Sequence, residues 1–292
     1  RKMKYPSLYD VTNKRSASYQ KRYFFFLRLE YCILILNAVN AFLTYEKKHI
    51  VALVLFSMLM LMMVLKIKKT SEQEWYKYRA ITESIKTVSW KFSMRAEPFN
   101  DEDEVKNINS LSEYLEDIVG GSEFISKTID PKSVDESTVT DEMKGLRTLS
   151  FEKRRDFYVD GRINDQRDWY VSKAQANKDA GKKWNICMFV IYVLAFLCSL
   201  YNAYYSVPGS IIPISILTTI ASSLVGWIQV KRYSELSASY ILTAHEIGVI
   251  KEQASYVSSE SDFSSFIRDA ETAFSREHTQ WIARRVANRK PK

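Results

Sequence analysis

The chain has 292 residues and a formal net charge of +8, and its mean hydropathy is −0.23 although 46% of its residues are hydrophobic. Apolar residues are therefore concentrated in some segments while the rest is strongly charged, and the positive balance suits an anionic lipid surface or anionic ligand. The eight glycines form no phosphate loop, and the sequence has no nucleophile elbow or paired-histidine motif. Three cysteines within apolar runs and three scattered histidines offer no metal-ligand spacing, so we expect neither an enzyme nor a bound cofactor or metal.

Two apolar runs near the N-terminus predict a first membrane hairpin. Residues 23–45 and 50–65 are separated only by residues 46–49. A helix needs about 20 apolar residues to cross ~30 Å of hydrocarbon. The second run is shorter, but Lys66 and Lys68 extend it because their stems reach the headgroups. A cleavable signal peptide is not expected, since the segment is long, lacks a small-residue cleavage site and precedes another span.

The region after this hairpin is polar and amphipathic. An apolar stripe at three- and four-residue steps, from Trp75 to Phe92, predicts a helix that continues the second span. Residues 100–121 predict another helix, with Asn100 as the N-cap and acidic residues over its positive end. Residues 121–148 lack periodicity and are predicted to be a loop.

A second hairpin follows in the C-terminal half. Residues 184–205 carry no charge over 22 positions, and residues 211–230 are twenty more uncharged residues, closed by Lys231 and Arg232. A buried hairpin of a soluble bundle is the alternative, but two full-length runs in succession are rare in soluble cores. The helices on either side contain no proline, so we expect each span to continue into its polar helix without a break.

Apolar stripes predict that the two helices flanking the second hairpin pair with each other. Val159, Ile163, Tyr170 and Ala174 form one stripe, and a second stripe runs from residue 233 to residue 254. Because the hairpin turn is short, the entering and leaving helices should lie side by side as an antiparallel stalk outside the membrane. A last amphipathic helix is expected over residues 262–288.

The sequence also repeats itself. KIKKTSE at 66–72 matches QVKRYSE at 229–235, an offset of 163 residues, and KRY at 21–23 matches KKW at 182–184 at an offset of 161. Chance similarity between two basic membrane borders is the alternative explanation. We predict a first repeat over 1–98, a connecting helix and loop over 99–150, and a second repeat over 151–292. The expected fold is an all-α membrane protein with four spans whose helices extend as antiparallel stalks into a helical body.

Basic residues indicate how the spans are oriented. Only Lys47 and Lys48 lie in the two hairpin turns, whereas twelve basic residues flank the spans on the other side. By the positive-inside rule both termini and the middle of the chain are cytoplasmic, in a multi-pass protein of the plasma membrane. The twelve are Lys14, Arg15, Lys21, Arg22, Lys66, Lys68, Lys69, Lys178, Lys182, Lys183, Lys231 and Arg232.

Three stretches of the C-terminal half are distinctive as a set, with an uncharged hairpin between the first two: RINDQRDWYVSKAQANKDAGKKWN at 162–185, YSELSASYILTAHEIG at 233–248 and TAFSREHTQW at 272–281. Together they resemble the SLATT family of bacterial two-span effector domains. WKFSMRAEPF at 90–99 is similar to the segment after the hairpin in the N-terminal member of tandem SLATT proteins. The most specific residues are Arg162, Asp165, Gln166, Trp169, Tyr170, Lys173, Ala174 and Asn177.

The resemblance implies an effector of bacterial antiviral defence in the inner membrane. Such domains accompany nucleotidyltransferases or ligand-sensing domains and are thought to open pores that harm the infected cell. A single four-helix bundle is filled by its own side chains, so conduction would need a homo-oligomer, for which we favour a tetramer. A nucleotide or oligonucleotide made by a partner nucleotidyltransferase would regulate it. The alternatives are a non-conducting membrane scaffold and a transporter, although a transporter normally has more spans.

Polar side chains inside the predicted spans are the candidates for lining a pore. Small and hydroxyl residues in spans more often serve helix packing, and long charged side chains also suit headgroup depth. A lipid-facing amide is unfavourable, so the two asparagines of the first span should face protein or water. The candidates are Arg28, Glu30, Asn37, Asn40, Ser215, Thr219 and Ser222.

Cations interleaved with aromatic residues before the third span suggest a nucleotide-binding surface. Guanidinium groups bind phosphates in a bidentate manner, and aromatic rings stack on bases. Pairing of these cations with Asp156, Asp165 and Asp168, along one helix or across helices, is the competing explanation. The candidates are Arg154, Arg155, Arg162, Arg167, Trp169, Tyr170, Lys173, Arg284 and Arg285.

Overall fold

A computed structural model of the chain describes residues 3–68, 71–120, 138–205 and 213–287. Over these residues the regular structure is helical and contains no strand. Four helical stretches are long and apolar enough to cross a membrane. The predicted class, an all-α membrane protein with two hairpins and four spans, is confirmed.

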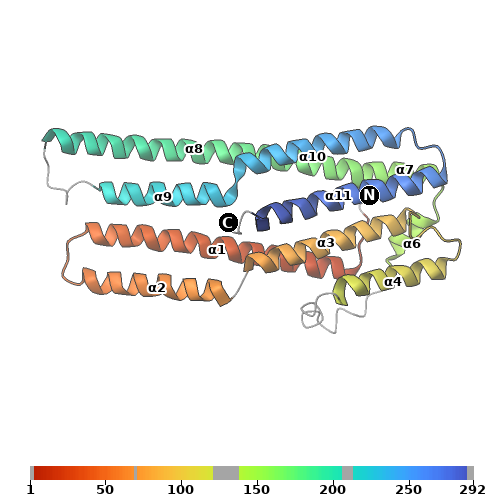
Figure 1. Cartoon of the computed structure of the whole chain (residues 1–292), viewed down its shortest axis with the longest axis horizontal. Coiled ribbons are helices and arrows are strands. Elements are labelled where there is room, and N and C mark those ends of the chain that lie inside the picture. The colour runs from red at the N-terminus through yellow and green to blue at the C-terminus, as the bar shows by residue number, and fades with distance from the viewer. Residues whose placement is uncertain (1–2, 69–70, 121–137, 206–212, 288–292) are drawn as a thin grey trace. The chain divides into compact units, whose positions relative to one another are not determined.

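The first hairpin consists of α1 (Ser7–Phe42) and α2 (Lys48–Lys68). Helix α1 begins well before the apolar run, so the entering polar helix and the first span are one element (Figure 1). The next helix, α3 (Ser71–Ser93), carries the predicted stripe, and Tyr78, Ile85 and Phe92 are buried. Residues 69–70, where α2 would continue into α3, lie outside the described residues.

The second hairpin differs from the prediction at two points. Helix α8 (Asp165–Tyr205) is one 41-residue helix, but α9 (Ile214–Lys231) begins at Ile214 rather than at residue 211. Pro213 holds the N-cap position, where a proline suits the start of a helix and not its interior. The expected unbroken passage from α9 into α10 (Tyr233–Ala254) is wrong, because Arg232 adopts a left-handed conformation with φ of 52°. Its guanidinium group pairs with Glu235 in the first turn of α10.

Shorter helices connect and follow the hairpins. Helix α4 (Glu104–Gly120) is capped by Asp103 and not by Asn100, because the Asp103 carboxylate accepts the Val105 N–H at 2.9 Å. The predicted loop over 121–148 contains α6 (Asp141–Arg147), and residues 121–137 lie outside the described residues. A π-helical turn, η2 (Val159–Asn164), separates α7 (Phe151–Tyr158) from α8. The last described helix is α11 (Glu260–Ala287).

Contacts divide the chain into two compact units, and each unit draws on both halves of the sequence. Unit 1 consists of residues 1–20, 72–170 and 243–292, and unit 2 of residues 21–71 and 171–242. The core of unit 1 is apolar and closely packed, with Trp90, Ile163 and Ile247 at or below 1% exposure. Val159, Ile163 and Tyr170 of the predicted stripe before the second hairpin thus share this core with Ile247 and Ala254 of the stripe after it.

Unit 2 is held together by contacts of α1 with α9 and of α8 with α10. The Phe24 and Trp227 rings lie 6.0 Å apart, and a side chain at Gly226 would meet the Tyr31 hydroxyl at 2.5 Å. In the second pair, Ser237 donates to the Ala174 carbonyl at 2.9 Å, and Gly181 lies against the Tyr233 side chain. Small residues on α8 and α9 therefore allow these helices to approach their partners closely.

Candidate functional site

Three arginines of unit 1 lie inside the protein. Arg147, Arg154 and Arg162 expose only 4%, 2% and 2% of their surface. A buried guanidinium group is tolerated only if it is paired and hydrogen-bonded, and each of these three is paired with one glutamate. Glu104 and Glu260 are half-exposed, whereas Glu271 is completely buried.

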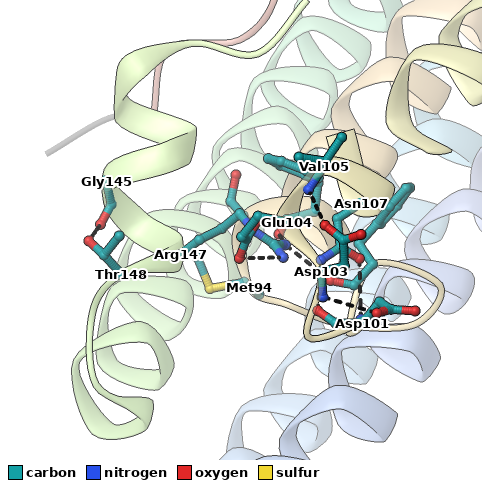
Figure 2. A network of polar contacts seen from close by, with 12 residues as sticks. Met94, Asp101, Asp103, Glu104, Val105, Asn107, Gly145, Arg147 and Thr148 are labelled. Carbon is teal, nitrogen blue, oxygen red and sulfur yellow. Dashed lines mark hydrogen bonds and ion pairs between the residues drawn. The ribbon is translucent and has the colours of Figure 1, made fainter. Parts of the chain in front are cut away.

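The first pair connects α6 with the start of α4. Arg147 Nε and Nη2 donate to the two oxygens of Glu104 at 2.9 and 3.1 Å, and Nη1 donates to the Phe99 carbonyl at 3.1 Å. Figure 2 shows Arg147 reaching Glu104 beside Asp103, the residue that caps α4. The Glu104 side chain is 52% exposed. This bidentate contact fixes where α4 begins, and water still reaches its carboxylate.

The Arg162 pair is buried from all sides. Glu271 has no exposed surface, and its two oxygens accept Arg162 Nε at 2.8 Å and Nη2 at 2.7 Å. The Tyr158 hydroxyl donates to one of these oxygens at 2.9 Å, and Thr87 donates to the other at 3.0 Å. Each carboxylate oxygen thus has two donors. The contacts tie α3, α7, η2 and α11 to one buried charge.

A second cation lies next to this pair. Gln166 Oε1 accepts Arg162 Nη1 at 3.2 Å and Lys86 Nζ at 3.3 Å. Burial, and then the positive charge of Arg162, lower the pKa of Lys86 to about 8. Burial also raises the pKa of Tyr158, whose hydroxyl keeps its proton for Glu271. The cluster therefore holds a lysine that changes its charge close to physiological pH.

The π-helical turn brings two residues of this cluster to the same carboxylate. Tyr158 ends α7 and Arg162 lies in η2, and both contact Glu271. Single π-turns of this kind are often found at functional sites. Sequence analysis singled out Arg162 and missed Glu271. A signal was available, since Glu271 stands four residues after Ile267 and three before Phe274, on the otherwise apolar face of α11.

Some residues of the predicted nucleotide-binding surface are exposed, and others are buried in unit 1. The expectation that Arg154 and Arg162 are exposed is wrong, because their charges serve packing between elements. Arg154 is held by Glu260 and by the Met94 carbonyl at 2.7 Å. Tyr170 is partly buried against the core. The side chains of Arg284 and Arg285, near the end of α11, lie outside the described residues. The exposed candidates are Arg167, Trp169 and Lys173.

Two of the predicted cations line a common groove in unit 1. Arg155 and Arg167 lie on a groove of about 970 Å³ between the region of α7, η2 and early α8 on one side and α10 on the other. Arg155 is half-buried and contacts Asp156 at 3.3 Å, which agrees with the alternative of local charge pairing. The groove also contains His245 and Lys251. Its lining is of mixed charge, because Asp156, Asp160 and Glu252 belong to it as well.

Three of the four polar candidates of the first hairpin contact other groups within unit 2. Asn40 is 7% exposed and donates to the Lys48 carbonyl at 3.0 Å, while Tyr45 donates to its side-chain oxygen. Asn40 thus stabilises the hairpin turn. This structural role explains a buried asparagine in the span without a pore. Glu30 pairs with Lys66 of α2, and Arg28 lies over the Trp227 ring at 5.7 Å. Asn37 is half-buried.

Several hydroxyl residues of α9 are exposed. Ser215, Thr218 and Ser222 are exposed, whereas Ala221 and Ser223 on the same helix are buried. The Thr218 and Thr219 hydroxyls donate to backbone carbonyls one turn earlier, both at 2.9 Å. The chain itself therefore leaves a polar strip uncovered on a span.

These features define a helical membrane protein with two hairpins and a packed helical unit that contains a buried polar cluster. Residues 6–155 match the model for SMODS and SLOG-associating 2TM effector domain 3 (SLATT_3), and residues 158–281 match that for SMODS and SLOG-associating 2TM effector domain 1 (SLATT_1). The chain belongs to the SLATT family and carries two of its domains in tandem. No curated protein and no solved structure matches it.

Proposed function

We propose that the protein is a ligand-regulated pore or ion channel of bacterial antiviral defence, built from several copies of the chain in the inner membrane. The role is non-catalytic. The family supplies the coarser part of this proposal, since both of its matched domains are two-span effector domains. Among the described residues, no group of three histidine, cysteine or acidic side chains is placed to hold a metal ion.

The observation that carries the proposal is the uncovered polar strip of α9. Its exposed hydroxyl residues are Ser215, Thr218 and Ser222, on a helix that carries no charged residue before Lys231. The surface of a span that the chain itself does not bury must contact lipid, water or other copies of the chain. In the most apolar window of α8 none of the residues is buried within the chain, and in that of α2 only 6% are. Assembly around α9 would place the hydroxyls along a water-filled axis and leave the apolar faces to lipid.

Regulation by an anionic nucleotide is part of the proposal. The groove that holds Arg155 and Arg167 has room for such a ligand and offers guanidinium groups to a phosphate. It lies beside η2, the turn that leads directly into α8. Helix α8 then continues without a break through the third span, which gives a bound ligand a mechanical connection to the membrane.

Ion flux through liposomes that contain the purified protein tests the pore. We expect Ser222→Leu combined with Ser215→Leu to reduce the flux at least tenfold, because leucines would dewet a narrow axis. Ser57→Leu and Ser199→Leu are matched controls, because these two serines are also exposed and lie on the other spans α2 and α8. The controls should conduct like the wild type. Absence of flux from the wild type, with and without oligonucleotides, would favour the scaffold alternative.

Cysteine labelling tests the proposed orientation. Ser137 and Ser210, which the sequence places on opposite sides of the membrane, lie outside the described residues. Lys47, in the turn between α1 and α2, and Ser259, just before α11, are described and exposed. In a chain without its native cysteines, Lys47→Cys should react with an impermeant reagent added outside the cell, and Ser259→Cys should not. Labelling of both positions from the same side would contradict the four-span topology.

A further inference from the structure

A second groove lies in unit 2, where α8 enters the membrane. It has a volume of about 800 Å³ and is formed by α8 and the first part of α10. Along α8 its lining runs from Ala174 to Phe189, and on α10 it runs from Ser234 to Ile241. Neither the proposed pore nor the proposed nucleotide site uses these residues.

Small residues line the groove and the contact between its two helices. Gly181 lies against Tyr233, where an added Cβ would stand 3.1 Å from the Tyr233 Cβ. The Ser237 hydroxyl is used in a hydrogen bond to the Ala174 carbonyl at 2.9 Å. The helices thus approach closely at these points, and Ala238 contributes only a methyl group to the groove.

The groove changes from basic to apolar along α8. Lys178 and Lys182 are exposed and stand one helical turn apart on the lining face. Asp179, beside them in the sequence, accepts from Gln175 Nε2 at 2.9 Å. Further along the same face, Phe189 is 67% exposed within the span. From the first lysine to this ring the helix rises by about 16 Å.

We infer that this groove binds one molecule of an anionic phospholipid. A phosphodiester would lie between Lys178 and Lys182, and an acyl chain would follow the exposed side chains of Ile186 and Phe189 into the hydrocarbon. The order of polar and apolar groups in the groove matches the order in a phospholipid at the membrane border, and basic pockets at this depth suit anionic headgroups. A second copy of the chain fits less well, because two such grooves placed face to face would oppose their lysines.

Native mass spectrometry of the full-length protein tests this inference. The protein is purified in detergent with equal amounts of phosphatidylglycerol and phosphatidylcholine that have identical acyl chains. We expect the wild type to retain one more phosphatidylglycerol than phosphatidylcholine per chain. Lys178→Gln with Lys182→Gln should reduce this retention about thirtyfold, in line with about 1 kcal/mol for each basic residue near an anionic surface. Ala238→Trp should reduce it without a change of charge, because the indole would fill the groove.

Lys21→Gln with Lys183→Gln is the matched control, since both lysines are exposed, flank spans and lie outside the lining of this groove. The inference is overturned if both double variants lose the lipid equally, if Ala238→Trp retains it, or if phosphatidylcholine binds as well as phosphatidylglycerol. Displacement of phosphatidylglycerol by equimolar glycerol 3-phosphate would show a simple phosphate site instead. If Ala238→Trp lowers the oligomer mass while lipid retention is unchanged, a second copy occupies the groove.

Discussion

Units 1 and 2 bury different kinds of residues. In unit 1 the rings of Phe92 and Phe99 are completely buried, and Arg162 and Glu271 are enclosed with them. In unit 2 the rings of Phe189 and Phe196 are 67% and 65% exposed. Unit 1 therefore resembles the core of a water-soluble domain, which apolar burial stabilises from within. Unit 2 depends on the bilayer, or on other copies of the chain, to cover its apolar surface.

The difference extends to how each unit achieves a specific packing. Unit 1 uses buried arginine–glutamate pairs whose geometry allows few alternatives. Unit 2 uses close approach at small residues, as at Gly181 and Gly226. Lipid is as apolar as leucine, so hydrophobic burial does not distinguish one helix face from another inside the membrane, and shape has to do so.

The largest expected effect follows from removing the buried carboxylate of unit 1. Glu271→Gln should lower the free energy of unfolding of unit 1 by about 3–5 kcal/mol, because it leaves Arg162 buried with an uncompensated charge. Amide hydrogen exchange of α11 and α3 in the detergent-purified protein measures this effect locally.

Glu104→Gln is the matched control for Glu271→Gln. It removes the same charge from the Arg147 pair, but its side chain is 52% exposed, so water can compensate and the cost should be about 1 kcal/mol. Equal losses of unfolding free energy in the two variants would mean that burial of the carboxylate does not affect the strength of the pair. Buried and half-exposed pairs would then stabilise the fold to the same extent.

A smaller effect is expected from filling a close contact in unit 2. In Gly226→Ala the new methyl group would stand 2.5 Å from the Tyr31 hydroxyl, so α1 and α9 have to separate or the tyrosine has to move. We expect a loss of about 1–3 kcal/mol, measured by titration with a denaturing detergent. Tyr31→Phe in the same chain should restore part of the loss, because it removes the atom that clashes.

Gly248→Ala in unit 1 is the counterpart of that variant. Here the nearest atom is Arg167 Nε at 3.9 Å, an ordinary contact. Alanine favours helix over glycine by up to about 1 kcal/mol, so this change should be neutral or stabilising. Destabilisation at Gly248 as large as at Gly226 would show that these glycines serve something other than close approach.

The sequence predicts well what depends on local composition. The four spans and the stripe through Ile85 and Phe92 follow from hydrophobic length and period, and both are present. The burial of Arg154 and Arg162 depends on partners about 110 residues away, Glu260 and Glu271, which the local pattern of charges around the arginines does not reveal. Because these distant partners are not apparent in the local sequence, the mixture of arginines and aromatic residues predicts a ligand-binding surface.

The boundaries of elements were harder to predict, because several residues compete for each role. Asn100 and Asp103 are both good N-caps, and the contact of Glu104 with Arg147 of α6 accompanies the later start. Nothing in the sequence around Arg232 excludes a continuous helix, since neither glycine nor proline marks the break. The break coincides with the packing of Tyr233 on Gly181, a tertiary contact.

The smallest expected effect concerns the pH dependence of unit 1. The pKa of Lys86 is lowered to about 8, below its ordinary value of 10.5, so between these pH values the unfolded chain binds more protons at this residue than the folded chain does. Lys86 should therefore make unit 1 more stable as the pH rises from 8 towards 10. Above pH 10 the gain should reverse, because burial raises the pKa of Tyr158 and the unfolded state then loses that proton first. Thermal unfolding at pH 7.5, 8.5 and 9.5 should show an increase of a few degrees in the wild type that Lys86→Met removes. Lys153→Met changes an exposed lysine of the same unit and should keep the increase. If both variants keep it, the lysine beside Arg162 is not the group that titrates, and the buried cluster responds to pH through another residue.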